Sequence, residues 1–467
     1  MVPVRFTEWI ATRRRCQSLL VLWLTIFAGC SESDSRSTER LSSREQESRF
    51  RSVAAEDWAR FATEDQDSVG WIALPEPVSK PLFQSQADPS ALGIVGPEAC
   101  SDCHAEQVLG FLQTAHALTS RAATPETVLG PLDPPRNSLE TRVDGFSFET
   151  KADGERAVLV TVTYPTGKHT QAMEFPLAFA VGSGNHGQSY LIWHGDQLCQ
   201  SPVSYFSEKD CWSNSPGTYK DGTADFARPA TTRCLDCHNT WVAHAPGTVN
   251  RYDAEHSILG VTCVRCHGPA KDHMTYHRMF PHESHAQAIV NPGRLDRQRS
   301  LEVCAQCHSG GGELLRPAFT FRPGERLDEW IQLDLNAQSP DNDDPHSANQ
   351  LGRLMRSRCF QESESLTCAS CHDPHRPERG DSARFSKRCL SCHQVESCGL
   401  AEKSASAIQK NCVDCHMPTR RDAQVAAQGV GDPLLPLLRD HQIAIWYDVS
   451  RVVQQRFAVD DDQSIDR

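Results

Sequence analysis

The chain has few apolar residues for its length. Only 39% of its 467 residues are hydrophobic, although a chain this long could hold two or three ordinary domains. Part of its core must therefore come from something other than aliphatic side chains. The apolar run SLLVLWLTIFAG at 18–29 is also too short to span a bilayer comfortably.

The chain also lacks an excess of positive charge. Its formal net charge is −13, and residues 1–29 contain four arginines against one glutamate, so the rest of the chain is more acidic still. Nucleic acid is excluded as a partner on this ground, because its binding depends on basic groups that neutralise phosphates. A basic protein or a small solute suits this charge better.

Cysteine, in contrast, is abundant, with 20 residues. Fourteen of them form seven Cys-x-x-Cys-His motifs, the pattern that attaches c-type heme through two thioether bonds and one imidazole ligand. The motifs are Cys100-Cys103-His104, Cys234-Cys237-His238, Cys263-Cys266-His267, Cys304-Cys307-His308, Cys368-Cys371-His372, Cys389-Cys392-His393 and Cys412-Cys415-His416. A zinc half-site or a redox dithiol would not require a histidine after every second cysteine. The sequence thus predicts seven covalently attached hemes c, whose large apolar rings compensate for the low aliphatic content.

The N-terminus has the organisation of an export signal. Arg13, Arg14 and Arg15 precede the apolar run, which ends at Cys30, as in a signal peptide. The Ala-Gly-Cys sequence at 28–30 is similar to a lipoprotein cleavage box, so we expect Cys30 to carry lipid. An ordinary signal peptide or a retained anchor is the alternative, since Phe27 stands where such boxes usually carry leucine. Either way the protein is expected outside the cytoplasm, in the periplasm or at the cell surface, and membrane-anchored if lipidated.

The long interval between the first and second motifs predicts a β insert. FSFETKADGERAVLVTVTY at 146–164 alternates on both sides of an Ala-Asp-Gly turn, which indicates a hairpin. GSGNHG at 182–187 matches a dinucleotide fingerprint, but a strand-like run follows it instead of a helix, so a tight turn is the preferred interpretation. The expected fold is mainly α and irregular, packed around hemes, with a small inserted antiparallel β subdomain. The expected segments are 1–29 signal peptide, 30–93 flexible tether and extension, 94–140 first heme segment, 141–206 β insert, 207–445 core with six hemes, and 446–467 tail.

A second axial ligand on each iron decides between electron transfer and substrate chemistry. His116 follows His104 by twelve residues of helix-like sequence, a rise of about 18 Å, so it cannot bind the iron of its own motif. His273 and His375 are too close to their own motif histidines for the same reason. We expect these three, and His441, to ligate the iron of another heme. Weaker candidates are His346, His244 and His186, and then His256, His277, His282 and His285.

Four cysteines outside the motifs and the export segment remain: Cys199, Cys211, Cys359 and Cys398. Disulfides among them are compatible with an extracytoplasmic protein. Cys199 with Cys211 is the simplest pair by sequence distance, and the connectivity stays open.

Several segments resemble one family. GPEACSDCHAEQVLGFLQTAHA, GVTCVRCHGPAKDH, LTCASCHDPH, NCVDCHMP and the late DHQI resemble, in this order, multiheme cytochromes of the cytochrome c-552/4-like kind, over about residues 94–445. Tetraheme cytochromes and hydroxylamine oxidoreductase are more distant relatives. The resemblance implies distal-ligand roles for His116, His273, His375 and His441. Pentaheme nitrite reductase has a lysine-ligated motif that this chain lacks, so nitrite reduction by that route is not indicated.

The leading hypothesis is an exported heptaheme cytochrome that passes electrons through mostly bis-histidine hemes in a respiratory chain, with basic or membrane-bound redox proteins as partners. The main alternative is a multiheme oxidoreductase with one open-site heme that acts on a small nitrogen or sulfur compound. A structural or sensory heme protein is the third possibility. The sequence leaves the oligomeric state undetermined.

Overall fold

The computed structural model describes residues 88–166, 168–216, 228–310, 312–333, 349–402, 408–421 and 434–452. The expected signal peptide, Cys30, almost all of the tether and His346 lie outside these residues. The described segments belong to one compact unit, Val53–Arg467. Across the described segments, no helix has the length and apolarity that a bilayer crossing requires.

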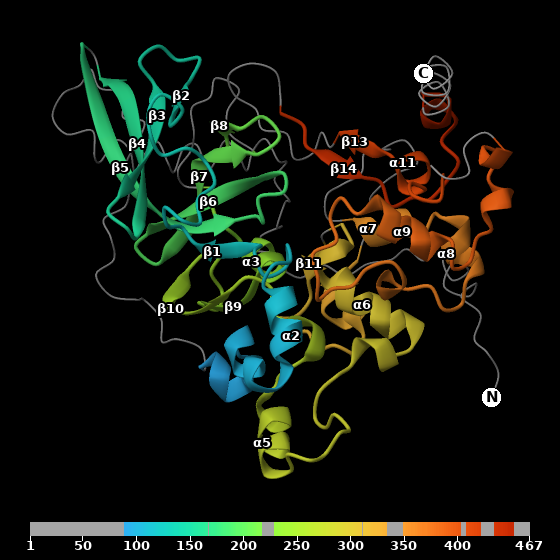
Figure 1. Cartoon of the computed structure of the whole chain (residues 1–467). Helices are drawn as coiled ribbons and strands as arrows, with labels where there is room; N and C mark the ends of the chain where they lie inside the picture. Colours follow the sequence, from blue (N-terminus) through green and yellow to red (C-terminus); the bar gives the residue numbers. More distant parts are fainter. Residues whose placement is uncertain are drawn as a thin grey trace, which may run out of the picture. The chain divides into compact units, whose positions relative to one another are not determined.

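One antiparallel sheet dominates the N-terminal half of this unit (Figure 1). Its strands run in the order β2-β3-β4-β5-β6-β7-β8, and β1 pairs with β5 off this path. The strands are β1 (Ser120–Ala122), β2 (Ser138–Glu140), β3 (Ser147–Asp153), β4 (Ala157–Thr166), β5 (His169–Val181), β6 (Gly187–His194), β7 (Gln197–Phe206) and β8 (Cys211–Asn214). Three short pairs follow: β9 (Asn239–His244) with β10 (Tyr252–Leu259), β11 (Glu313–Leu314) with β12 (Ile331–Gln332), and β13 (Thr419–Arg421) with β14 (Leu437–Arg439).

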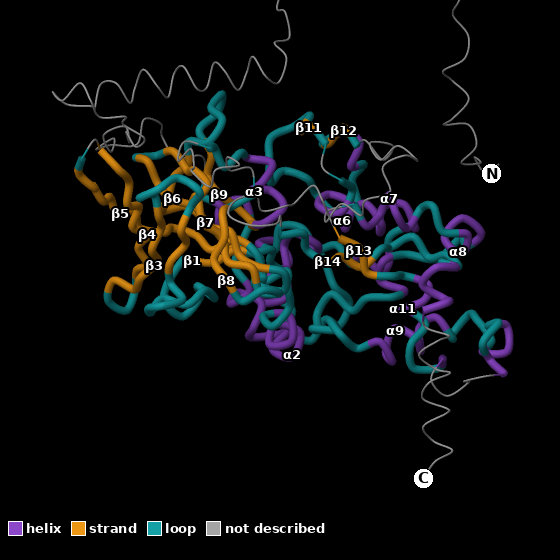
Figure 2. The backbone as a smooth tube through the Cα atoms, turned by 90° about the horizontal axis from the view of Figure 1, so that it is seen from above, coloured by secondary structure: helices purple, strands orange, loops and turns teal. Residues whose placement is uncertain are grey.

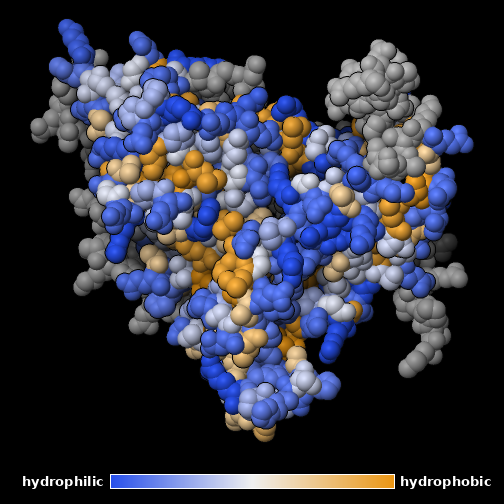
Figure 3. All heavy atoms as spheres, in the orientation of Figure 1, coloured by the Kyte–Doolittle hydropathy of each residue, from blue (hydrophilic) through white to orange (hydrophobic). Residues whose placement is uncertain are grey.

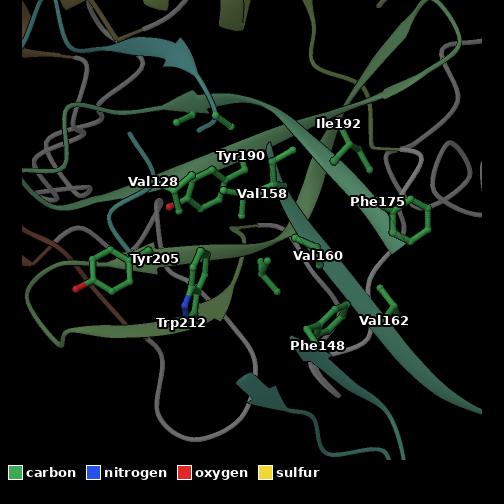
Figure 4. Packing of buried hydrophobic residues seen from close by; sticks show 14 of the residues in the cluster. Val128, Phe148, Val158, Val160, Val162, Phe175, Tyr190, Ile192, Tyr205 and Trp212 are labelled. Atoms are coloured by element: carbon green, nitrogen blue, oxygen red, sulfur yellow. The ribbon is translucent and has the colours of Figure 1, made fainter. Parts of the chain in front are cut away.

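The sheet forms because its strands alternate between apolar and polar residues. In β4 the side chains of Val158, Val160 and Val162 are fully buried, as expected for alternate residues that face one core. They pack with Phe148, Phe175, Tyr190 and Trp212, among others (Figure 4). The β3–β4 hairpin and the tight turn of GSGNHG between β5 and β6 are both confirmed. The turn takes a positive φ at Gly182 and Gly184, which glycine adopts readily.

The expected fold class is wrong. Antiparallel sheet is a main component of the structure: strands β1 to β8 form one sheet, and β9 and β10 form a separate two-stranded sheet. The β9 residues are nearly all buried, so this strand has no apolar–polar alternation that the sequence could display. The same is true of most of β7. In the β3–β4 hairpin one face is buried and the other is more exposed, so its sequence shows a period of two.

The helices are short and cluster beside the sheet (Figure 2). The α-helices used below are α2 (Ser101–Phe111), α3 (Thr232–His238), α4 (Cys263–His267), α5 (Lys271–Met279), α6 (Arg297–His308), α7 (Gln350–Leu354), α8 (Arg358–Glu362), α9 (Ser382–Cys389) and α11 (Val413–His416). The 3₁₀ turns are η3 (Pro89–Leu92), η4 (Pro97–Cys100), η5 (Pro292–Arg294), η6 (Leu327–Glu329), η7 (Cys368–Ser370) and η8 (Val395–Ser397).

The helical region has a small apolar core. A cluster of seventeen buried residues supports the sheet, whereas the cluster beside α6 contains five, namely Ala305, Phe321, Leu327, Trp330 and Ile331. Figure 3 shows a largely hydrophilic face with scattered apolar patches. A region with so little aliphatic burial gains little from the hydrophobic effect by itself, which fits the expectation that bound hemes supply the missing apolar surface.

Candidate heme-binding sites

Each motif lies on a short helix or turn that gathers its three reactive groups. In α4 the thiols of Cys263 and Cys266 and the imidazole of His267 occupy positions i, i+3 and i+4, which share one helix face. The helix ends at Gly268, whose φ of 82° suits glycine. The motifs at His238, His308 and His416 likewise end α3, α6 and α11. The first motif is carried by η4 and α2, the fifth starts at η7 and the sixth starts at the last residue of α9.

The structure brings four motif histidines next to the four histidines expected as distal ligands. Each pair has ring centres close to 6 Å apart. The pairs are His104–His273 at 6.3 Å, His267–His375 at 6.1 Å, His308–His116 at 6.0 Å and His372–His441 at 6.2 Å. In three pairs the rings are within 20–27° of parallel, and in the His308–His116 pair they are nearly perpendicular, at 80°.

These distances suit one iron between two imidazoles. A metal–imidazole nitrogen bond is about 2 Å long, so two rings that bind one metal from opposite sides have centres about 6 Å apart. A direct stack of the two rings would bring them closer. All four pairs join residues of different motif segments, as the spacing arguments required. The residues present therefore fit bis-histidine heme at four positions.

Hydrogen bonds at Nδ1 orient most of these imidazoles. His267 and His273 have Nδ1 2.8 Å from the carbonyl oxygens of Val290 and Gln287. The same atom of His308 lies 2.8 Å from the Gln350 side-chain oxygen. Further Nδ1 contacts join His238 to the Thr119 hydroxyl (2.8 Å), His416 to the Ala444 carbonyl (2.9 Å) and His441 to the Arg439 carbonyl (3.1 Å). Such partners fix the ring and its tautomer in metal-ligating histidines, and they leave Nε2 for the metal.

Burial keeps the two deepest distal candidates neutral. Burial, followed by the charges of the neighbouring His308 and His372, lowers the pKa of His116 to about 4. Burial, followed by the charge of His372, likewise lowers the pKa of His441 to about 4. Only neutral imidazole has a lone pair for a metal, so both side chains are prepared for ligation at any pH above about 5.

Three motif histidines have different surroundings. Among the described residues, no second imidazole ring stacks against His238, His393 or His416. Two of the weaker candidates, His244 and His186, have Nε2 occupied by other groups, and His346 lies outside the described residues. Nε2 of His244 lies 2.8 Å from the Thr248 carbonyl, and Nε2 of His186 lies 3.2 Å from the Arg379 guanidinium.

Cys211, Cys359 and Cys398 form no disulfide within the described residues. Phe206 is paired with Cys211 across the β7–β8 turn, and Cys199 lies seven residues before Phe206, roughly 24 Å along the strand. The proposed Cys199–Cys211 disulfide is therefore absent. Cys199 is buried instead, with its sulfur 3.5 Å from the Asn250 amide nitrogen. Spacing along the sequence did not show that both residues belong to one extended hairpin.

Sequence reasoning missed the groups that support the ligands. Gln350 and Thr119 contact His308 and His238 through side chains, and each is far from its histidine in sequence. No motif marks such residues, because they are brought together only by the tertiary fold. The remaining supports are backbone carbonyls, which any residue type can provide.

The comparisons with known proteins agree with this architecture. The profile of the family described as cytochrome c554 and c-prime matches residues 186–268, which contain the motifs that begin at Cys234 and Cys263. Together with the seven motifs, these matches support a multiheme c-type cytochrome. The resemblance inferred from the motifs is thereby confirmed.

One curated relative and one solved structure are similar to this multiheme cytochrome. The dissimilatory sulfite reductase MccA of Wolinella succinogenes is 22% identical over 377 residues, which cover 69% of this chain and 50% of the relative. The chain thus spans about half the length of that relative. The outer cell wall cytochrome OcwA aligns with a TM-score of 0.48 and 14% identity, over 75% of this chain and 79% of the other.

Proposed function

We propose that this multiheme cytochrome carries seven hemes and relays electrons in a respiratory chain outside the cytoplasm. The four imidazole pairs with centres 6.0–6.3 Å apart support this proposal most directly. An iron with two imidazole ligands has no open position for a substrate, so its chemistry is electron transfer at low potential. The protein's own residues would bind each heme and orient most of the imidazoles through their Nδ1 hydrogen bonds.

The fourteen motif cysteines and seven motif histidines are the proposed attachment and proximal-ligand residues, with His116, His273, His375 and His441 as distal ligands. Cys30 is the proposed lipidation site, and basic or membrane-bound redox proteins are the proposed partners of this acidic chain. The intact mass of the mature protein tests two of these points together. It reports the number of attached hemes and whether the N-terminal cysteine carries acyl chains.

Low-temperature EPR of the oxidised, heme-loaded protein tests the electron-transfer proposal. If the proposal is right, at least four hemes are low-spin with bis-histidine signals. Fewer than four low-spin hemes in a fully loaded protein would contradict it.

A multiheme oxidoreductase is the second candidate. It is favoured by His238, His393 and His416, which have no stacked imidazole among the described residues, and by the similarity to a protein named as a sulfite reductase. Adding sulfite, nitrite and hydroxylamine in turn to the EPR sample separates the candidates. A high-spin heme whose signal changes with one compound supports the enzyme. Spectra that respond to none of the three support the electron carrier.

A further inference from the structure

Three consecutive motifs are joined by the same residue position. The residue just before the second cysteine is Asp236 in the second motif, Arg265 in the third and Gln306 in the fourth. The Arg265 guanidinium donates to the Asp236 carbonyl at 2.9 Å and to its carboxylate at 3.1 Å. The Gln306 amide donates to the Arg265 carbonyl at 3.1 Å. All three residues are at most 6% exposed, so they form a buried, hydrogen-bonded group that we call the motif triad.

Further contacts close the motif triad. Arg233 donates to the Gln306 carbonyl at 3.0 Å and to the second carboxylate oxygen of Asp236 at 3.4 Å. The backbone N–H of Phe319 donates to the Asp236 carboxylate at 2.7 Å. The Arg265 charge also interacts electrostatically with the thiols of Cys307 and Cys237, so it lies near two heme-attachment residues.

The corresponding residues of other motifs are arranged differently. Asp102 in the first motif and Ser391 in the sixth are exposed, and Asp414 in the seventh pairs with Arg439 at the surface. This position faces away from the two cysteines and the histidine on a helical turn, so it usually points to solvent. In the motif triad, the three residues at this position contact each other instead of solvent.

We propose that Asp236, Arg265 and Gln306 are positioning residues that hold the hemes of the second, third and fourth motifs as one rigid group, and that the buried charge of Arg265 raises the reduction potentials of these hemes. The inference rests on the proposed attachment of heme at these motifs. Arginine stays protonated in proteins. Oxidation adds one positive charge to a heme, and a nearby buried positive charge opposes that addition more strongly than an exposed one. Arg233 and Arg265 together outweigh Asp236 by one positive charge.

Redox titration of the heme-loaded variants, followed by the visible heme bands, tests the proposal. Arg265→Gln removes the charge and should shift part of the titration curve to lower potential. Arg265→Lys keeps the charge and should restore most of the wild-type curve. Asp236→Asn removes the opposing charge and should shift the same part to higher potential. A purely structural role would not give opposite shifts for the two neutralised charges.

Asp102→Asn is the matched control. It removes a charge at the same motif position, but this side chain is exposed and its charge is screened by water, so the curve should stay unchanged. The intact mass reports the number of hemes in every variant, which separates a failed heme attachment from a failed charge effect. If the Arg265 variants do not mature, Arg233→Gln, which changes a partly exposed side chain, should give the same downward shift. Equal curves for wild type and all matured variants would overturn the proposal.

Discussion

At the scale of the residue, the two nitrogens of each imidazole determine what a histidine can do. In His308 the Gln350 side chain occupies Nδ1 and leaves Nε2 for a metal. In His244 the Thr248 carbonyl occupies Nε2, the nitrogen that projects furthest from the backbone. Two histidines that the sequence presents as equals are thus separated by their hydrogen bonds. Counting histidines overestimates the number of available ligands for this reason.

Removal of one distal candidate should open one iron. His273→Ala leaves His104 without its partner ring, so we expect one low-spin heme to become high-spin and to bind carbon monoxide after reduction. EPR and the optical spectrum under carbon monoxide check this expectation. The matched control is His277→Ala, because the His277 ring lies 4.6 Å from that of His273 but next to no motif histidine. An unchanged spectrum for His273→Ala at full heme content would contradict the assignment.

At the scale of the element, the sequence predicts strands whose apolar residues recur with a regular period. It does not reveal strands that are buried on both faces. The β3–β4 hairpin was predictable because the buried Val160 and Val162 alternate with Thr161 and Thr163. Strand β9 follows His238 directly and is buried almost throughout, so nothing in NTWVAH distinguished it from the irregular segments expected around hemes. The short motif helices were predictable from the motif spacing alone.

Helix α7 connects two candidate ligands. Its Gln350 contacts His308, and its Arg353 forms a bidentate ion pair with Asp440, the residue before His441. Both charges of the pair are buried, with side-chain exposures of 2% and 0%. Arg353→Met leaves a buried carboxylate that keeps the Gln442 N–H at 2.8 Å and Arg420 at 3.6 Å. The loss of the bidentate partner should cost about 3 kcal/mol of unfolding free energy.

Guanidinium unfolding of the heme-loaded protein measures this loss. The control is Arg358→Met, which removes an exposed ion pair with Glu362 on α8 and should cost at most about 0.5 kcal/mol. Similar losses for the two variants would show that the buried pair does not anchor the segment of His441.

Glu378 connects the fifth motif segment to α9. Its carboxylate accepts from the Asp373 N–H at 2.9 Å and from Arg388 and Arg384 of α9. Burial alone would raise the pKa of Glu378, but Arg388, the Asp373 N–H and Arg384 outweigh it and lower the pKa to about 2. The unfolded-state pKa is about 4.3. Glu378 therefore stabilises the fold above that value, and its contribution decreases as the pH falls towards 2.

Glu378→Gln should lower the unfolding free energy at pH 7. The difference in unfolding free energy between the variant and wild type should become smaller as the pH falls from 4.5 to 2. Unfolding free energies measured across this range check both effects. The exposed Glu364 provides the control. The difference in unfolding free energy between Glu364→Gln and wild type should stay almost constant across this pH range. A Glu378→Gln variant as stable as wild type at pH 7 would contradict the role of this carboxylate.

At the scale of the whole molecule, the sequence shows which residues can hold hemes but not which residues share one. His273 and His375 follow their own motifs closely, so a role on another heme could be argued from chain length alone. That His273 meets His104, while His375 meets His267, depends on how α2, α4 and α5 pack. Long-range packing of this kind leaves no trace in local spacing, and the motif triad was invisible for the same reason.

The buried apolar residues are distributed unevenly between the sheet and the helical region, and this predicts how the chain behaves without heme. The sheet has its own apolar core of seventeen buried residues, whereas the described residues after 297 have a cluster of only five. We therefore expect that region to depend on heme burial for stability. In a chain expressed without heme attachment, we expect residues 120–214 to retain protected strands and residues 297–452 to be open. Limited proteolysis with mass mapping should then cut after residue 297 first, while the heme-loaded protein resists in both regions. Equal cleavage of both regions in the heme-free chain would mean that the sheet, too, depends on the hemes.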